Sequence, residues 1–363
     1  MASSVGRLLP IGLARAVTVF RTVTAAFAAL SVLSPAADIV AKAAVRTCQH
    51  TQYTVLELPF LPYVISPTGV VAGITERHRA ILWHRESGAR ELPVPEGFHY
   101  TEPVGITRSG AIVINAFDAA MRKHRAFVYS NGSFLPLAGN QTFGSFLPLA
   151  GNQTLAHGLS PMGLVVGEWV PEGQTTSEAV YWNHDVPHPL GFCCGGTLKA
   201  ANRAAEMIGD AYDEQRHYHA FAWSQTDSQR TLGPTSSYSS AVAINDSGHI
   251  LLQVGPDGYL DQSGHPRRLD LSTKFYNNPR ALNNCDFVVG GYGPDSDHYH
   301  GFLWTPAAGF QDLNSLIRGD SGWTLKDVTG INDRGEMVGR GDFHHDDTGF
   351  LLVPGHGPGH APP

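Results

Sequence analysis

Histidine and aspartate gather in three short stretches of the sequence, at residues 210–219, 295–300 and 342–347. Imidazole and carboxylate groups at close spacing can hold a cation, bind a polyhydroxylated ligand, or move protons on a sugar or a uronic acid. Residues two apart on an extended strand point to the same side. His217 and His219 would therefore face the same way, as would the histidines of the second stretch. The sequence predicts a shared His/Asp site at which these stretches meet.

We expect ligand contacts from these stretches and from tyrosines in the connections between repeated units. The expected ligand-binding residues are Asp213, His217, Asp297, His298, His344, Asp346, Tyr100, Tyr238 and Tyr276. Aromatic faces flanked by Asp and Asn suit sugar rings, through contact with C–H faces and hydrogen bonds to hydroxyls. The alternative is that the rings pack between neighbouring units and that the histidines, with His345, lie in solvated loops.

The same stretches carry features that favour structural roles. His219 and His300 recur at one position of a repeated unit, which favours a backbone or acidic partner within that unit. Asp295 and Asp297 are the candidates for a cation, but two carboxylates without the full calcium-loop pattern are insufficient. We therefore expect no metal, no cofactor and no catalytic residue. If the protein is an enzyme, its acid–base residues would be His217, His298 and His344.

A unit that recurs seven times between residues 53 and 354 must position these side chains. Each unit contains a strand end, a polar turn and a glycine, as in AINDSGHILL and GINDRGEMVG. Its apolar anchors are Ile65, Ile106, Leu159, Ala201, Ile244, Leu282 and Ile331, at intervals of 41, 53, 42, 43, 38 and 49 residues. A period of about 40 residues built of short strands is typical of a propeller blade.

The longest interval contains an exact tandem copy. GSFLPLAGNQT occurs at Gly132–Thr142 and again at Gly144–Thr154, displaced by 12 residues, and without this displacement the interval of 53 becomes 41. A longer surface connection costs little, because the entropy of loop closure rises slowly with length. We expect the copy either to enlarge a loop or to offer two alternative fourth strands.

The two ends of the repeat region predict how the ring closes. The last unit ends after its third strand, GFLLVP, and has no fourth strand. The segment Tyr53–Pro59 has the fourth-strand pattern and precedes the first unit. Pairing these two ends would remove the unpaired sheet edges of an open array. We therefore predict an all-β fold, a seven-bladed β-propeller of four-stranded blades closed by an N-terminal strand.

The repeat resembles the HAF family of extracellular repeat proteins. The resemblance is carried by the third-strand motifs at His219–Trp223 and His300–Trp304 and by the turns at Asn245, Asn283 and Asn332. It covers nearly all of the chain after residue 43. The early units depart from it, since the Asn is replaced by Ser66, Thr107 and Ser160, and the His by Arg79, Arg125 and Glu178. The resemblance implies export and a propeller-like fold, and it supplies no active-site residues.

The regions outside the repeat indicate export. Residues 1–43 carry three arginines before an apolar stretch and end in Ala41-Lys42-Ala43, so we expect a secretory signal peptide. A retained membrane anchor and a transit peptide are the alternatives. We further expect a linker at 44–52, the propeller at 53–354 and a disordered Gly/Pro/His tail at 355–363. These features predict a protein secreted to the extracellular space or the periplasm.

The four cysteines of an exported protein have access to an oxidising compartment. Adjacent cysteines rarely pair with each other, so we expect Cys48 and Cys285 each to pair with one of Cys193 and Cys194. Unpaired, small core residues are the alternative. No set of cysteines and histidines has zinc-site spacing.

These observations favour a non-catalytic propeller that binds glycan or another extracellular or cell-surface ligand through a His/Asp/aromatic face. The first alternative is a secreted carbohydrate-active enzyme, a polysaccharide lyase or hydrolase that uses His, Tyr or Asp on the same face. The second is a scaffold for another protein. A net charge of −7 without a basic stripe disfavours nucleic acid. We expect a monomer with no membrane span once the signal is removed.

Overall fold

The computed structural model describes residues 52–130, 133–136, 153–171, 173–183, 186–226, 228–233, 238–271, 276–295 and 298–355. The chain divides into two units, Met1–Ala43 and Ala44–Pro363. The first unit, which holds the predicted signal peptide, lies wholly outside the described residues. Within the described part of the chain, no helix has the length and apolar character needed to cross a membrane.

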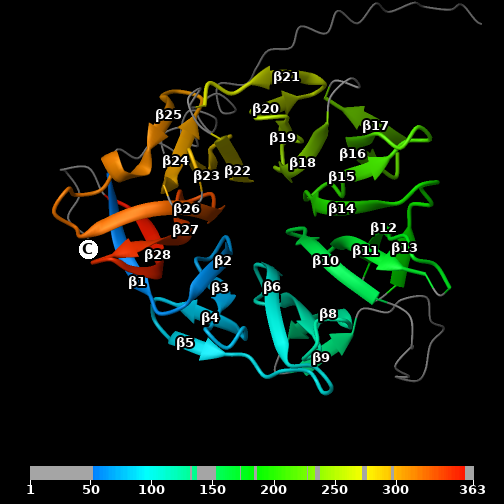
Figure 1. Cartoon of the computed structure of the whole chain (residues 1–363), viewed down its shortest axis with the longest axis horizontal. Coiled ribbons are helices and arrows are strands. Elements are labelled where there is room, and N and C mark those ends of the chain that lie inside the picture. Colours follow the sequence, from blue (N-terminus) through cyan, green and yellow to red (C-terminus); the bar gives the residue numbers. More distant parts are fainter. Residues whose placement is uncertain are drawn as a thin grey trace, which may run out of the picture. The chain divides into compact units, whose positions relative to one another are not determined.

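The second unit is a ring of seven antiparallel four-stranded sheets, which confirms the predicted seven-bladed propeller (Figure 1). Blades are numbered here in chain order, and the first strand of each lies nearest the centre of the ring. Blade 1 comprises β2 (Leu61–Ile65), β3 (Val71–Ile74), β4 (Ala80–His84) and β5 (Gly88–Glu91). Blade 2 comprises β6 (Tyr100–Ile106), β7 (Ile112–Phe117), β8 (His124–Ser130) and β9 (Ser133–Pro136). Blade 3 comprises β10 (Gln153–Leu159), β11 (Val165–Val170), β12 (Glu178–Asn183) and β13 (Val186–Pro189).

The next three blades follow the same order, from the centre of the ring outwards. Blade 4 comprises β14 (Gly196–Ala201), β15 (Met207–Tyr212), β16 (Tyr218–Ser224) and β17 (Ser228–Leu232). Blade 5 comprises β18 (Ser239–Ile244), β19 (Ile250–Val254), β20 (Asp257–Gln262) and β21 (His265–Arg268). Blade 6 comprises β22 (Tyr276–Leu282), β23 (Val288–Gly293), β24 (His300–Thr305) and β25 (Gly309–Asp312), and a short 3-10 helix, η2 (Leu313–Ser315), follows it.

Blade 7 closes the ring with strands from both ends of the repeat region. Its strands are β26 (Trp323–Ile331), β27 (Met337–Phe343), β28 (Asp346–Pro354) and β1 (Tyr53–Leu58). The antiparallel pairing runs from Tyr53 opposite Pro354 to Leu58 opposite Gly349, as the sequence predicted. One further hydrogen bond, from the Gly355 N–H to the Gln52 carbonyl at 2.8 Å, continues the ladder.

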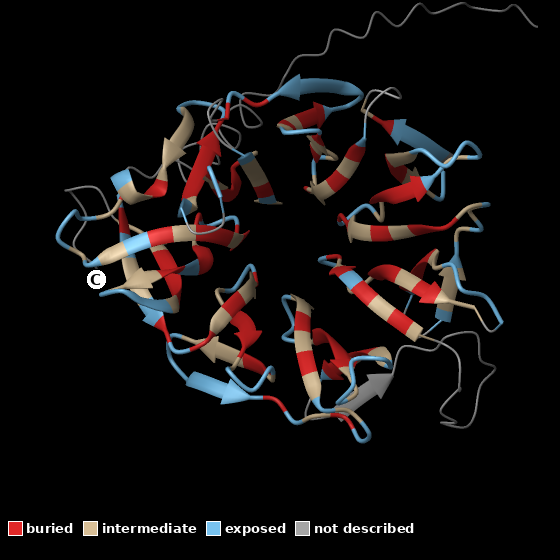
Figure 2. Cartoon of the chain, viewed as in Figure 1, coloured by how far each residue is buried: buried red, intermediate tan, exposed pale blue. Residues whose placement is uncertain are grey.

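The core lies between neighbouring blades. Burial is greatest in the second strands, and β3 is buried throughout, whereas the outer strands β5 and β21 are exposed throughout (Figure 2). This follows from the architecture, because a second strand has strands on both edges and a blade on each face. The recurring tryptophans near the ends of the third strands pack in these interfaces. They are Trp83, Trp182, Trp223 and Trp304.

Every first strand contains a β-bulge three residues before its turn residue. The bulged residues are Tyr63, Val104, His157, Lys199, Val242, Arg280 and Thr329. At a bulge, two residues of one strand lie opposite a single residue of the partner strand, and this changes the direction of a side chain. The seven bulges therefore form a ring of equivalent positions on the innermost strands, called here the bulge ring. The strand β26 carries an additional bulge at Lys326.

The turn residue after each first strand links one blade to the next in the second half of the ring. In blades 4 to 7 this residue is a buried asparagine whose Nδ2 donates to the backbone carbonyl of the following turn residue. The donors are Asn202, Asn245, Asn283 and Asn332, at 3.1–3.2 Å, and the last reaches Ser66 of blade 1. We call this series the asparagine belt. Ser and Thr cap the turns of blades 1 to 3 through their Oγ atoms.

The tandem copy contributes its first half to the fold. The fourth strand of blade 2, β9, comes from the first copy and pairs with β8. The last two residues of the second copy begin β10 in blade 3. The segment between them, 137–152, lies outside the described residues.

The expected cysteine pairing is wrong. Cys193 and Cys194 are free thiols, whereas Cys285 is disulfide-bonded, and Cys48 lies outside the described residues. The reason is positional. The adjacent pair precedes β14, in a connection between a fourth and a first strand. Cys285 lies in the β22–β23 turn and packs against the core of blades 6 and 7.

Candidate functional site

Alternating strand direction places two sets of connections on one face of the ring. The loops between second and third strands and those between fourth and first strands leave the same side, called here the connection face. The opposite side, the turn face, carries the asparagine belt. The predicted site residues that the structure describes lie in, or at the strand ends beside, one or the other of these two sets of connections. The common face inferred from the sequence is therefore present in the fold.

Three tyrosines gather on the connection face where blades 4 and 5 meet. Tyr212 ends β15, Tyr218 begins β16, and Tyr238 precedes β18. The rings of Tyr218 and Tyr238 stack with centroids 5.3 Å apart and an interplanar angle of 10°. Tyr212 meets Tyr218 edge to face at 4.9 Å. Tyr212 is 43% exposed and Tyr238 is 59% exposed, so this tyrosine patch presents aromatic surface to solvent.

A buried carboxylate supports the tyrosine patch from below. Asp210 is fully buried and accepts hydrogen bonds from the Tyr218 hydroxyl at 3.1 Å and the Ser240 hydroxyl at 3.0 Å. Its other oxygen accepts from the Ala241 N–H at 2.8 Å, which ties blade 4 to blade 5. Lys199 of the bulge ring pairs with Asp210 and donates to Ser240 at 2.6 Å. The ion pair compensates the buried charge.

The environment keeps the tyrosines protonated. Desolvation by burial, and then the nearby Asp210 carboxylate, raise the pKa of Tyr218 above its usual value. The same two causes, in the same order, raise the pKa of Tyr238. Both phenols are therefore neutral hydrogen-bond donors at physiological pH. The patch combines apolar ring faces with hydroxyl donors, the Lys199 ammonium and the Ser240 hydroxyl.

The connection between β15 and β16 places an aspartate and two histidines beside the tyrosine patch. Asp213 Oδ2 lies 3.3 Å from His217 Nδ1 and 3.4 Å from His219 Nε2. The other oxygen, Oδ1, accepts a hydrogen bond of 2.7 Å from the backbone N–H of His217 and so caps the turn. Burial raises the pKa of the Asp213 carboxyl, but the backbone N–H groups and the two imidazoles lower it further, so the net pKa is below its usual value. We call this group the imidazole cluster.

Blade 6 holds its histidines in two separate pairs. His298 Nδ1 lies 2.7 Å from Asp295 Oδ1, and both side chains are more than half exposed. His300 Nδ1 lies 3.1 Å from Asp312 Oδ2, which also accepts the Tyr292 hydroxyl at 2.9 Å. His300 thus has an acidic partner within its own blade, as its recurring position predicted. Asp297 lies outside the described residues.

In blade 7 the predicted histidines form a tight hairpin turn. His344 and His345 join β27 to β28 with φ values of 50° and 79°. Two consecutive left-handed residues are typical of a type I′ turn, which usually contains Asn and Gly. The His344 ring lies 4.3 Å from that of Phe343, and Asp346 pairs with Phe343 across the hairpin. His344, His345 and Asp346 are all exposed.

The two remaining predicted tyrosines begin first strands of other blades. Tyr100 begins β6 and lies edge to face with His78 at 6.0 Å. Tyr276 begins β22 and is 70% exposed. The structure brings three of the nine expected ligand residues, Asp213, His217 and Tyr238, into the neighbourhood of blades 4 and 5. The other expected residues that the structure describes, Tyr100, Tyr276, His298, His344 and Asp346, are distributed over blades 2, 6 and 7.

Sequence reasoning missed the basic members of the bulge ring. They are His157, Lys199 and Arg280, on the first strands of blades 3, 4 and 6. His157 Nε2 lies 3.6 Å from Glu168, and Arg280 Nη2 lies 3.1 Å from the buried Asp327. A signal was present, since each lies three residues before the turn residue of its unit. The bulge that aims these side chains depends on strand pairing and leaves no local motif.

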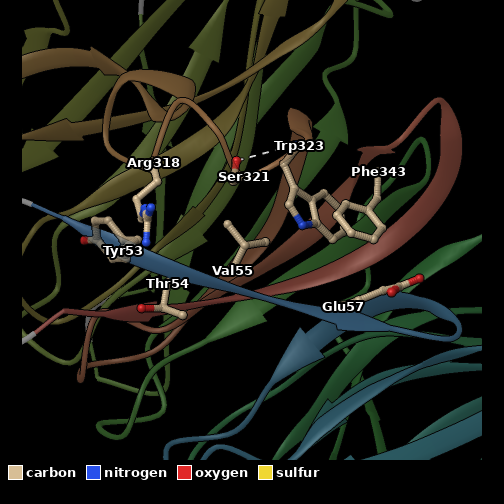
Figure 3. A pocket seen from close by; sticks show the side chains of 8 residues that line it. All are labelled: Tyr53, Thr54, Val55, Glu57, Arg318, Ser321, Trp323 and Phe343. Atoms are coloured by element: carbon tan, nitrogen blue, oxygen red, sulfur yellow. Dashed lines mark hydrogen bonds between the residues drawn. The ribbon is translucent and has the colours of Figure 1, made fainter.

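A pocket of about 320 Å³ lies elsewhere, beside the closing strand (Figure 3). Its lining comes from β1, from the connection before β26, from the start of β26 and from the end of β27. The lining residues are Tyr53, Thr54, Val55, Glu57, Arg318, Ser321, Trp323 and Phe343. The rings of Trp323 and Phe343 stack at 5.0 Å and form one end of the pocket. None of the expected ligand residues lines it.

Solved structures similar to this chain are propellers. Streptogramin B lyase is 12% identical with a TM-score of 0.54, and the match covers 83% of this chain and 97% of the lyase. Virginiamycin B lyase from Staphylococcus aureus is 11% identical with a TM-score of 0.53, over 83% of this chain and 100% of that one. The propeller domain of the Trilobed protease from Pyrococcus furiosus is 11% identical with a TM-score of 0.52, over 83% and 95%.

These identities support the fold alone. The Pyrococcus domain has an open velcro topology, whereas here β1 closes blade 7. No protein-family model matches the sequence, and no curated protein matches it.

Proposed function

We propose that the protein is an exported propeller that binds carbohydrate through the tyrosine patch of blades 4 and 5. The observation that carries the proposal is the exposed ring surface of Tyr212 and Tyr238 beside the Lys199 and Ser240 polar groups. Sugar rings present apolar C–H faces and hydroxyl edges, and this pairing of surfaces suits both. The signal-like N-terminus and the HAF resemblance support export.

The stacking within the patch gives the ligand a rigid surface. Tyr218 is held by Asp210 below and by Tyr238 beside it, so its ring has a fixed orientation. Preorganised aromatic side chains lose little conformational entropy on binding and often dominate interface energies. A sugar that stacks on Tyr238 would place its hydroxyls within reach of the neighbouring donors. The proposal therefore predicts binding centred on Tyr238 and Tyr212.

The test uses the full mature chain on a glycan array, followed by calorimetric titration with the best ligand. Tyr238→Ala and Tyr212→Ala are expected to weaken binding at least about tenfold each, equivalent to roughly 1.4 kcal/mol. Met162→Ala is the matched control, because Met162 is 69% exposed in the β10–β11 turn on the turn face. An array without binding, or equal losses in all three variants, would refute the proposal.

The same experiment separates the proposed binder from the enzyme alternative. Ligand recovered after incubation is analysed for cleaved or unsaturated product. A binder returns the ligand unchanged, whereas a lyase or hydrolase yields product that depends on His217, His298 or His344. At 11–12% identity, the similarity to the two lyases supports the shared fold and carries no argument about their reactions.

A further inference from the structure

We propose that the imidazole cluster of blade 4 is a binding site for a divalent transition-metal ion, with zinc the best match. Asp213, His217 and His219 each offer one ligand atom, and these three atoms lie within 4.8 Å of one another. Within the described residues, they are the one group of three potential metal ligands at this spacing. The inference does not depend on carbohydrate binding.

The distances fit a metal that is coordinated tetrahedrally. With bonds of about 2.0–2.1 Å, a tetrahedral zinc ion separates neighbouring ligand atoms by about 3.3–3.4 Å. The observed separations from Asp213 Oδ2 are 3.3 Å to His217 Nδ1 and 3.4 Å to His219 Nε2. Small movements of exposed side chains would complete the geometry. A fourth position would stay open to water or to an oxygen of a ligand.

The donor types select the class of metal. Two imidazole nitrogens and one carboxylate oxygen suit zinc and related transition metals, whereas calcium and magnesium prefer oxygen ligands throughout. The exposed fractions of the side chains are 66% for His217, 33% for Asp213 and 13% for His219. The ion would therefore enter from the solvent side, with His219 as its most buried ligand.

Comparison with blade 2 separates the turn-capping role of the aspartate from its contacts with imidazoles. Asp118 caps the equivalent turn, and its Oδ1 accepts from the N–H groups of Arg122 and Lys123. The turn cap is thus a structural role of the aspartate at this position. In blade 4 the second carboxylate oxygen also faces two imidazoles, which the turn itself does not require. The two basic residues of the blade 2 turn offer no metal ligand at neutral pH.

Direct binding measurements test the site. The chelator-treated full mature chain is titrated with Zn²⁺ by calorimetry, and Co²⁺ binding is followed by visible absorption, which reports tetrahedral coordination. We expect one site whose affinity falls at least about tenfold in His217→Ala, His219→Ala and Asp213→Asn. Asp213→Asn retains an oxygen for the turn cap, and His217 is mostly exposed, so both variants are expected to fold.

Two controls separate this site from other potential ligands. Asp118→Asn removes the matching carboxylate in blade 2 and is expected to leave Zn²⁺ affinity unchanged. A Cys193→Ser/Cys194→Ser double variant removes the free thiols and is also expected to retain the site. Undiminished Zn²⁺ binding in both His219→Ala and His217→Ala would overturn the proposal, as would loss of all binding in the double-serine variant.

Discussion

Removing one asparagine of the belt should destabilise the ring far more than removing its exposed neighbour. Asn245 is 4% exposed, and its Oδ1 accepts from the N–H groups of Ser247 and His249, both at 3.0 Å. Its Nδ2 donates to the carbonyl of Asn283 at 3.2 Å and to Asp286 at 2.8 Å. One side chain therefore caps its own turn and joins blade 5 to blade 6.

The expected loss follows from these four contacts. A hydrogen bond contributes about 0.5–1.5 kcal/mol net, and a buried group left without a partner costs about 1–3 kcal/mol. Water can replace Asn245 as the partner of the partly exposed Asp286 carboxylate. The loss therefore comes from the other three hydrogen bonds, those with Ser247, His249 and Asn283. Asn245→Ala should therefore lower the free energy of unfolding by about 3 kcal/mol. Asn245→Ser should restore about 1 kcal/mol, because Ser66 caps the equivalent turn through its Oγ.

The assay is urea unfolding followed by tryptophan fluorescence, with Asn284→Ala as the matched control. Asn284 is exposed. The hydrogen bonds that its side-chain amide donates to Asp246 and Asp333 are exposed to solvent as well. Its removal should cost under about 1 kcal/mol. Equal losses for Asn245→Ala and Asn284→Ala would refute the idea that the belt joins the blades.

Three further outcomes are expected from other parts of the ring. Leu58→Ala should lower the free energy of unfolding in urea by about 2–5 kcal/mol, because Leu58 is fully buried between blades 7 and 1. The neighbouring Glu57→Ala should lower it by under about 0.5 kcal/mol. Similar losses in the two variants would contradict closure by β1. His345→Gly should raise the unfolding free energy by about 1 kcal/mol, since its φ of 79° is strained for any residue with a Cβ; unchanged thermal stability would contradict this. Burial raises the pKa of Asp312, but hydrogen bonds from His300, Asn314 and Tyr292 lower it further, so its net folded pKa is depressed. The stability contributed by the Asp312 carboxylate is then present above the unfolded pKa and is lost as pH falls through the folded pKa. The free energy of unfolding of Asp312→Asn should therefore fall less than that of the wild type between about pH 7 and pH 3. An equal fall in both proteins would contradict this prediction.

The blade count and the closure of the ring could be predicted because their signals are local. Each polar turn, each glycine and each aromatic third strand repeats along the chain, so the period alone indicates the number of units. The fourth-strand pattern at Tyr53–Pro59 matched a gap at the other end of the repeat. The HAF resemblance and the export signal remain predictions, because no contact among the described residues tests either of them.

The candidate site could be predicted only in part. Asp213, His217 and Tyr238 were identified because loops between strands are where ligands are commonly bound. Tyr218 was overlooked, and so were the polar bulged residues such as Lys199. Their roles depend on side chains from neighbouring first strands, such as Ser240, which are remote in sequence.

The sequence by itself determined the repeat, the strand order and the face on which each connection lies, because these follow from periodicity and alternating strand direction. Only the tertiary structure decided which connections share a neighbourhood and which cysteines are free. It also placed Asp210 beneath the tyrosines, and it brought His219 to the second oxygen of a carboxylate that caps a turn. Such choices depend on bulges and on contacts between blades, which arise only when strands distant in sequence pair and pack.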